Sequence, residues 1–182
     1  MNDTQQSAPA TDAQTPTNTA TVIVAGSRDL FERFDSFLDQ PDQVKLVAKA
    51  IYAAGLEPDS IGEVVHGDND GSPDAWGKAF GDCHPTAEVN PFDPDWDDLD
   101  HPDAYVKDGQ YGKYNARAGF IRNEEMAVHA AMQPGPSRLI AFWDGESNGT
   151  ENMIENAEEH GVPVKVFRLD RDSEREVLLS HV

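Results

Sequence analysis

The sequence predicts an α/β fold built on a mainly parallel sheet, and three observations support this. Short apolar runs, typical of buried strands, alternate with segments that carry the helical spacing of apolar residues. Most of these runs end in a glycine-containing loop that leads into a helix. The length of 182 residues suits one domain. About five strands over residues 21–169 fit a Rossmann-like, doubly wound sheet with right-handed connections.

The first predicted elements follow a polar tail. Residues 1–20 are rich in Thr, Gln, Asn and Pro without apolar periodicity, which predicts disorder. Residues 21–25 (TVIVA) form a nearly continuous apolar run, typical of a buried parallel strand. Helical spacing then covers residues 31–54, where Pro41 begins a second helix and Gly55 ends it.

The middle of the chain predicts two strands, one helix and a long loop. Residues 63–66 (EVVH) form the second strand, and Pro73 begins a helix that reaches about Cys83. Residues 87–91 form a weaker third strand. The stretch 93–118 is irregular and contains many Asp, Pro, Gly and Tyr residues. A loop of this length inside a compact domain is typical of a lid or binding loop.

The last part of the chain returns to alternating elements. A helix is predicted over 119–132, followed by the most apolar strand of the chain at 138–143 (RLIAFW). A helix over 151–160 ends at a glycine, and residues 162–167 form the last strand. Residues 170–182 form a tail or a short helix.

The charge of the chain is strongly negative. It has 14 Lys and Arg against 34 Asp and Glu, a formal net charge of −20, and only six of the cations are lysines. At about 1 M salt the Debye length is near 3 Å, so the self-repulsion of such a chain is screened. This composition predicts a halophilic source, archaeal or viral; an acidic protein that binds basic partners is the alternative. No basic stripe exists to neutralise phosphates, which excludes general nucleic-acid binding.

Membrane and cysteine signals bound the function further. No apolar run approaches the roughly 18–20 residues of a membrane span, and the first residues are polar rather than signal-like. The sequence therefore predicts a soluble, cytoplasmic protein with no membrane partner. Its single cysteine, Cys83, excludes an internal disulfide and a Cys-x-x-Cys metal site. No metal site is predicted from the residues.

Candidate ligand-binding residues gather at the carboxyl ends of the predicted strands, where doubly wound sheets bind ligands. They are Gly26, Ser27, Arg28, Gly67, Gly71, Asp74, Gly119, Arg122, Asn123, Asp144, Gly145, Ser147, Asn148, Gly149 and Thr150. Glycines let backbone N–H groups approach a ligand, helix N-termini favour anions, and arginine suits phosphate or carboxylate. The alternative is that the arginines only neutralise local carboxylates and the glycines only make tight turns.

Five ordered motifs suggest a family. They are Val24-Ala-Gly-Ser-Arg28, Gly71-x-x-Asp74, Ala118-Gly119-x-x-Arg122-Asn123-x-x-Met126, Gly149-Thr150-x-x-Met153-Ile154-x-x-Ala157 and Gly161-Val-Pro-Val164. Over residues 21–167 the chain resembles the YspA/YpsA-related group of the SLOG superfamily, which is similar to the DprA and Lonely Guy folds. Members range from ligand sensors to phosphoribohydrolases. The resemblance implies a nucleotide or nucleotide-derived ligand.

The resemblance also implies roles for individual residues. Ser27 and Arg28 would contact phosphate or ribose, Arg122 would correspond to the arginine of the hydrolase site, and 149–150 would cradle phosphate. The chain departs from the Lonely Guy pattern Pro-Gly-Gly-x-Gly-Thr-x-x-Glu, because Gly-Glu-Ser-Asn stands at 145–148 and Met153 replaces the glutamate. This weakens the hydrolase assignment and leaves the binding assignment.

The loop after the second strand departs from the family as well. It carries Asp68 and Asp70, and two carboxylates beside a phosphate repel it unless a cation bridges them. This predicts either a Mg²⁺-bridged ligand or a ligand that presents sugar hydroxyls to this loop. Two tyrosines of the long loop, Tyr111 and Tyr114, are candidates to cover a nucleobase. Trp76, on a helix, is predicted to be a core residue.

Three functions stay open. The first is binding of a nucleotide-like small molecule, as a sensor. The alternative is a nucleotide N-glycosidic hydrolase in which Arg122 steadies the phosphate or leaving group and a carboxylate stabilises the transition state; the candidates are Asp68, Asp70, Asp144 and Glu146. The third is a structural or interaction protein that retains the fold, and homo-oligomers are compatible with all three. A pocket carboxyl with a raised pKa would favour the hydrolase, and a pocket occluded by 93–118 would favour the third.

Overall fold

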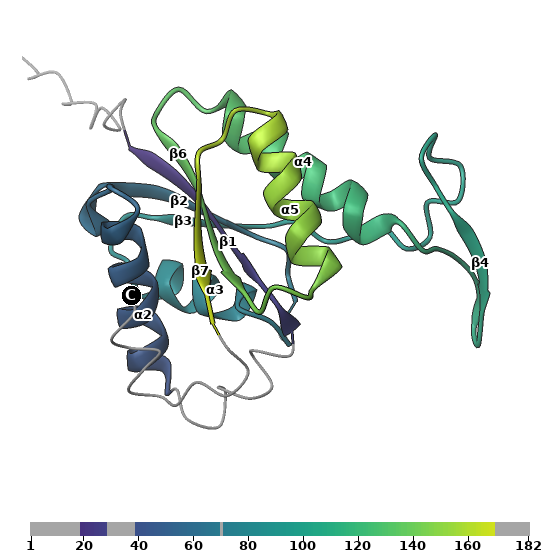
Figure 1. The fold of residues 1–182 in the computed structure, drawn as a ribbon, viewed down its shortest axis with the longest axis horizontal. Helices are drawn as coiled ribbons and strands as arrows, with labels where there is room; N and C mark the ends of the chain where they lie inside the picture. Colours follow the sequence, from purple (N-terminus) through teal and green to yellow (C-terminus); the bar gives the residue numbers. More distant parts are fainter. Residues whose placement is uncertain (1–18, 29–38, 70, 170–182) are drawn as a thin grey trace, which may run out of the picture.

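A five-stranded parallel sheet forms the centre of the molecule, which confirms the predicted α/β class (Figure 1). The computed structural model describes residues 19–28, 39–69 and 71–169. The strand order is β3-β2-β1-β6-β7. The strands are β1 (Ala20–Gly26), β2 (Ile61–His66), β3 (Glu88–Pro91), β6 (Ser137–Trp143) and β7 (Val164–Arg168). The order reverses between β1 and β6, which pair in parallel from Thr21 to Gly26.

Among the described residues, four helices cover the two faces of this sheet, as in a doubly wound fold. They are α2 (Gln40–Ala53), α3 (Asp74–Cys83), α4 (Ala118–Met132) and α5 (Asn148–Glu159), with a short 3₁₀ helix at Pro58–Ser60. The helices α2 and α3 lie on one face, and α4 and α5 lie on the other (Figure 1). None of the helices among the described residues is both long and apolar enough to cross a membrane.

Strand β1 explains why the sheet needs cover on both faces. Val22 and Val24 are fully buried in the cluster that contains α2 and α3, while Ile23 is buried in the cluster that contains α4 and α5. Consecutive strand residues point to opposite faces, so a continuous apolar run buries both. Trp76 of α3 packs edge-on against Phe142 of β6 at a ring distance of 5.2 Å. The prediction that Trp76 is a core residue is confirmed.

Most predicted elements lie within three residues of their expected bounds. The part of the predicted helix 31–54 that is described, α2, begins after Asp39, whose carboxylate accepts a hydrogen bond from the Asp42 N–H at 3.0 Å. Gly55 follows this helix with φ of +82°, a conformation that favours glycine. Residues 31–38 and 170–182 lie outside the described residues. The predicted tail 1–20 does so as far as residue 18, and Ala20 already begins β1.

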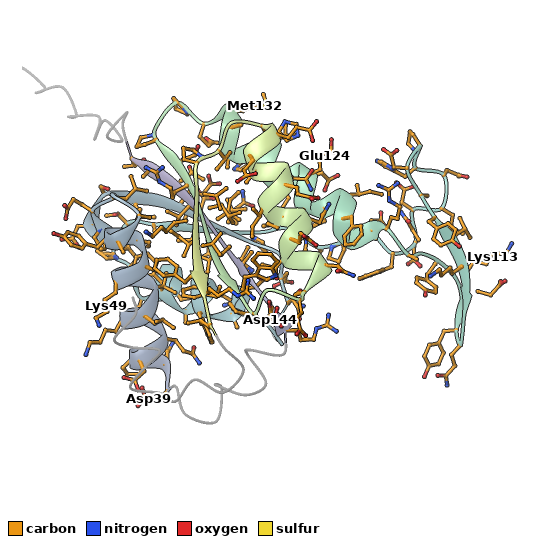
Figure 2. The ribbon with its side chains drawn as sticks, in the orientation of Figure 1. Asp39, Lys49, Lys113, Glu124, Met132 and Asp144 are labelled. Carbon is orange, nitrogen blue, oxygen red and sulfur yellow. The ribbon has the colours of Figure 1, made fainter. Side chains whose placement is uncertain are left out.

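The prediction that residues 93–118 are irregular is partly wrong. The stretch contains an antiparallel hairpin of β4 (Val106–Gly109) and β5 (Gly112–Asn115), which we call, with its flanking residues, the hairpin arm (104–117). The arm projects from the sheet and its helices, and the side chain of Lys113 points away from the molecule (Figure 2). We call residues 93–103, which precede it, the acidic loop. The sequence gives no signal for these strands because β4 is fully exposed and has no buried alternation.

Candidate functional site

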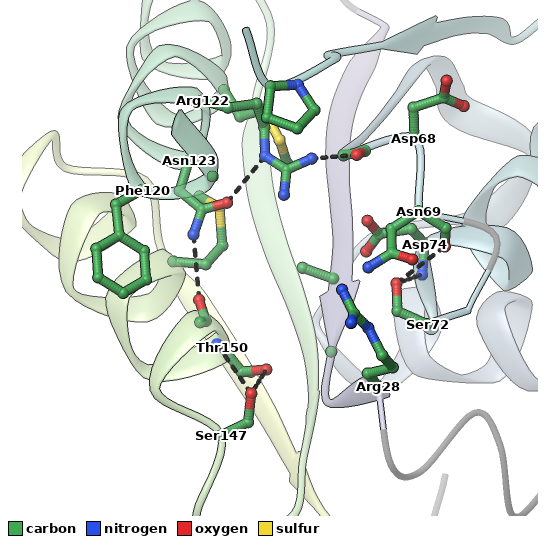
Figure 3. Close-up of a pocket in the computed structure, with 18 of the residues that line it drawn as sticks. Arg28, Asp68, Asn69, Ser72, Asp74, Phe120, Arg122, Asn123, Ser147 and Thr150 are labelled. Atoms are coloured by element: carbon green, nitrogen blue, oxygen red, sulfur yellow. Dashed lines mark hydrogen bonds between the residues drawn. The ribbon is translucent and has the colours of Figure 1, made fainter. Parts of the chain in front are cut away.

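A pocket of about 760 Å³ opens at the carboxyl edge of the sheet, beside the point where the strand order reverses (Figure 3). One wall comes from the end of β1 and the loop between β2 and α3. The other wall comes from the first turns of α4 and α5. The acidic loop contributes to the rim without filling the cavity, so the pocket is not occluded by residues 93–118. This is the position that the sequence predicts for a ligand.

Most of the predicted site residues meet in this pocket. Eleven of the fifteen line it: Gly26, Arg28, Gly67, Gly71, Asp74, Gly119, Arg122, Asn123, Ser147, Gly149 and Thr150. The candidate carboxylate Asp68 lines it as well. The remaining predicted residues are Ser27, Asp144, Gly145, Asn148 and the candidate carboxylate Glu146, and none of them is part of the lining. Asp70 lies outside the described residues.

Ser27 and Asp144 brace the site from inside the protein rather than facing the pocket. The buried Ser27 hydroxyl donates to Asp144 Oδ1 at 2.9 Å, and its oxygen lies 3.4 Å from Thr150 Oγ1. Asp144 Oδ1 also accepts the N–H groups of Glu146 and Ser147 at 3.0 and 2.9 Å. These bonds fix the loop between β6 and α5. The positions of Ser27 and Asp144 in the sequence do not show whether they support the loop or contact a ligand.

The loop between β6 and α5 places the helix N-terminus at the pocket. Ser147 is the N-cap of α5, and its Oγ accepts the Thr150 N–H at 3.4 Å. Gly149 lines the pocket, and a Cβ there would meet only Ser147 Oγ at 4.0 Å. A helix N-terminus carries partial positive charge and N–H groups that suit an anion. Exposed Arg28 lies across the pocket from it (Figure 3).

Arg122 holds the two walls together. Its Nη1 donates to the carbonyl oxygens of Gly67 and Phe92, the latter at 3.2 Å, and its Nε donates to Asn123 Oδ1 at 3.1 Å. A Cβ at position 67 would overlap the guanidinium, so glycine is required for this close approach. Burial lowers the pKa of Arg122, while the carboxylates of Asp74 and two further aspartates raise it. The alternative stated for the arginines, that they neutralise local carboxylates, therefore applies in part to Arg122, which also bonds to two backbone carbonyls.

Asp74 is the buried carboxyl of the pocket. It is the first residue of α3, and burial raises its pKa to about 6. The Arg122 guanidinium and hydrogen bonds from Ser72 and the backbones of Gly67 and Asn69 act against this rise. Such a group can accept or donate a proton near neutral pH. A pocket carboxyl with a raised pKa is the feature that was expected to favour the hydrolase. Asp74 has this feature, although the sequence predicted it only as a ligand-binding residue.

Two further carboxylates, Asp68 and Asp93, form an acidic edge of the pocket. Asp68 has φ of 48°, a left-handed conformation uncommon for residues other than glycine, and its N–H donates to His66 Nδ1 at 3.1 Å. The pKa of Asp93 is raised by a hydrogen bond between its carboxyl group and that of Asp68, and by the negative charge of Asp68. Burial lowers the pKa of His66. Among the described residues, no group of three His, Cys, Asp or Glu side chains is arranged to hold a metal.

Several lining residues were not among the predicted ligand-binding residues. They are Ala25, Asn69, Ser72, Asp93, Pro94, Trp96, Phe120, Met126 and Met153. Ala25, Met126 and Met153 do occur in the family motifs. Helical spacing also brings the two methionines to the pocket, because Met126 is four residues after Arg122 and Met153 is three residues after Thr150. The aromatic side chains at the pocket are Trp96 and Phe120. The hypothesis that Tyr111 and Tyr114 cover a base gains no support: neither lines the pocket, and Tyr111 is 96% exposed on the arm.

No protein-family model, curated protein or solved structure matches this chain. The resemblance to the SLOG superfamily therefore stays a prediction from the five motifs.

Proposed function

We propose that the protein binds a nucleotide or a nucleotide-derived ligand in this pocket. The observation that carries the proposal is the meeting of Arg28, the N-terminus of α5 and an aromatic rim at one sheet edge. In this proposal a phosphate group lies between Arg28 and Gly149, which both line the pocket, and is bound by a guanidinium and the backbone N–H groups of the first helical turn. The volume of about 760 Å³ lies within the range of small-molecule sites.

The other parts of a nucleotide have partners as well. Trp96 and Phe120 are 49% and 39% exposed at the rim, and an exposed aromatic face suits the stacking of a nucleobase. Asp68 and Asp93 suit ribose hydroxyl groups, because carboxylate oxygens accept hydrogen bonds from them. Both predicted modes fit this edge: the carboxylates can accept hydrogen bonds from sugar hydroxyls, or hold a Mg²⁺ ion together with a phosphate of the ligand, since one or two carboxylates suffice for that ion. Such a ligand is consistent with the predicted cytoplasmic location.

A thermal-shift screen in molar KCl tests the proposal. Nucleoside mono-, di- and triphosphates, NAD and ADP-ribose are added to the wild type, to Arg28→Gln and to Lys45→Gln, whose side chain is exposed on α2 away from the pocket. A ligand at about 100 times its dissociation constant adds roughly 2.7 kcal/mol, which is several degrees for a domain of this size. The shift should persist in Lys45→Gln and shrink in Arg28→Gln. The absence of a shift with every nucleotide, with and without Mg²⁺, would overturn the proposal.

Asp74 favours a second candidate function, hydrolysis of the N-glycosidic bond of a nucleotide. In that reaction the bond from C1′ to the base nitrogen breaks, water adds its oxygen to C1′, and the leaving base gains a proton. A buried carboxyl with a pKa of about 6 can take the proton of the attacking water. Release of free base from the ligand identified by the screen would establish the hydrolase. In Asp74→Asn, binding without release is expected.

A further inference from the structure

The hairpin arm gathers exposed apolar side chains that the pocket does not use. Of the eight large apolar side chains that are exposed among the described residues, five fall within residues 96–120: Trp96, Tyr105, Val106, Tyr111 and Phe120. Concentrated exposure of this kind marks an interaction surface, whereas single exposed apolar residues do not. Trp96 and Phe120 belong to the pocket rim. Tyr105, Val106 and Tyr111 lie on the arm and have no role in the pocket.

The arm is also an unusual sheet. It has two strands of four residues each, and every residue of β4 is exposed. An isolated two-stranded hairpin is marginally stable in water, and both of its edges offer backbone N–H and C=O groups to another chain. At its base the arm is tied to the acidic loop, where the Asn115 N–H donates to the Trp96 carbonyl at 2.8 Å. Beyond this base the arm extends away from the sheet (Figure 1).

Charge indicates which partner the arm fits. The arm carries Lys107, Lys113 and Arg117 against a single acid, Asp108, in a chain of net charge −20. The acidic loop beside it carries six aspartates and no lysine or arginine. Among the described residues, no ion pair joins the cations of the arm to this loop. The arm therefore offers positive charge and aromatic surface to a strongly acidic partner, and every copy of this chain presents such a surface.

We propose that the protein self-associates through this region. In a dimer with two-fold symmetry, the arm of each copy packs on the acidic loop of the other, so the same contact is made twice. The arm and the acidic loop together comprise residues 93–117, close to the roughly 20–30 residues that one side of a standard interface contains. A nucleic acid fits less well, because the six aspartates beside the arm repel phosphates.

The proposal also predicts what the dimer does to the pocket. The acidic loop includes Asp93 and Trp96, which line the pocket rim. An arm docked on the loop of its partner lies beside the entrance to the partner's pocket. Within one copy, no residue of the arm lines the pocket. The dimer would thus supply cover for the entrance that the single chain does not provide.

Charge reversal tests the reciprocal contact. One variant combines Lys107→Glu with Lys113→Glu, which changes the net charge of the arm from +2 to −2. Another combines Asp97→Lys, Asp98→Lys, Asp100→Lys and Asp103→Lys, which changes the net charge of the acidic loop from −6 to +2. None of these side chains is buried, and none lines the pocket. The mass of the full-length chain is measured by sedimentation over a range of concentrations, at the lowest KCl concentration at which thermal unfolding stays cooperative, so that screening is least. The wild type should reach twice the mass of the 20.0 kDa chain.

Each reversal alone should weaken the dimer about tenfold or more, because both of its contacts become repulsive. A mixture of the two variants should restore it, since each arm then meets a loop of opposite charge. Thermal unfolding of each variant checks that it folds. A monomeric wild type, a dimer that both reversals leave intact, or a mixture that stays monomeric would overturn the proposal. An oligonucleotide retained by a monomeric wild type would indicate the other partner.

Discussion

The hydroxyl of Ser27 donates a hydrogen bond of 2.9 Å to the carboxylate of Asp144, although 117 residues separate the two in the chain. Ser27 directly follows β1 and Asp144 directly follows β6, so the bond closes the sheet at the point where its strand order reverses. The same carboxylate oxygen orients the turn that starts α5. One buried bond thus sets the position of the helix N-terminus to which we assign phosphate.

The first prediction concerns this bond. Ser27→Ala should lower the free energy of unfolding by about 1–2 kcal/mol, because it removes a buried donor and leaves the Asp144 carboxylate with one partner fewer. Urea unfolding of the wild type and the variant measures the difference. Ser60→Ala is the control, since among the described residues its exposed hydroxyl bonds only to the Glu57 carbonyl. An equal loss of stability in both variants would show that the Ser27 bond has no special role.

The second prediction concerns pH. The pKa of Asp74 is about 6 in the folded protein and about 3.9 in an unfolded chain, so between these values the folded state binds the proton more tightly. The ionised Asp74 carboxylate therefore lowers the free energy of unfolding above pH 6, and this loss of stability disappears as pH falls from 6 to about 4. Asp74→Asn carries no charge at any pH. It should be more stable than the wild type at pH 7, by up to about 3 kcal/mol, with no difference near pH 4.

Urea unfolding of both proteins across this pH range checks the second prediction, because the other carboxylates cancel in the difference. A difference that is constant with pH would contradict it.

The third prediction compares two glycines of the pocket. Gly67→Ala should lower stability by about 1–3 kcal/mol and weaken ligand binding, because its Cβ would displace the Arg122 guanidinium. Gly149→Ala should raise stability by about 0.4–1 kcal/mol, since the residue is helical and a Cβ there has its nearest neighbour at 4.0 Å. It should still weaken binding if phosphate approaches the α5 backbone closely. Thermal unfolding with and without the ligand found in the screen separates the two effects. Unchanged binding in Gly149→Ala would place the phosphate elsewhere.

The fourth prediction concerns the aromatic rim. Trp96→Ala should reduce affinity for a nucleotide by about 1–3 kcal/mol, which is about 5- to 150-fold, while it hardly changes stability, because the side chain is half exposed. Isothermal titration measures the affinity. The matched control is Tyr52→Ala on α2, where the ring is 66% exposed and lies outside the pocket lining. If the two variants bind equally well, Trp96 does not stack on the base.

The sheet and its helices could be predicted because buried strands such as 21–25 and 138–143 need apolar residues on both faces. The hairpin arm could not, since its strands are exposed and β5 begins at Gly112, whose φ of +133° favours glycine. Within the site, glycines and arginines at strand ends identified the pocket. Whether a polar residue there faces the ligand or a neighbouring loop depends on the direction of its side chain. Arg28 lines the pocket, whereas the adjacent Ser27 bonds to Asp144 inside the protein.

The acidic loop shows the same limit. In so acidic a chain, the sequence does not distinguish its aspartates from general surface charge. The contact between Asp93 and Asp68 is visible only in the folded structure. Trp96 reaches the pocket because the loop bends back toward Gly119, whose ideal Cβ position lies 4.0 Å from the indole ring. Contacts between segments that are distant in sequence leave no periodic signal.

The pairing of β1 with β6 has a kinetic consequence. Strand β1 can pair with β6 only when residues 137–142 reach it. Closing the long loop between the two strands is slow compared with forming local structure. The two walls of the pocket belong to the two sides of this pairing, so a partly folded chain holds only half of the cavity. A ligand should therefore act late: it should slow unfolding of the completed protein and leave the rate of folding unchanged.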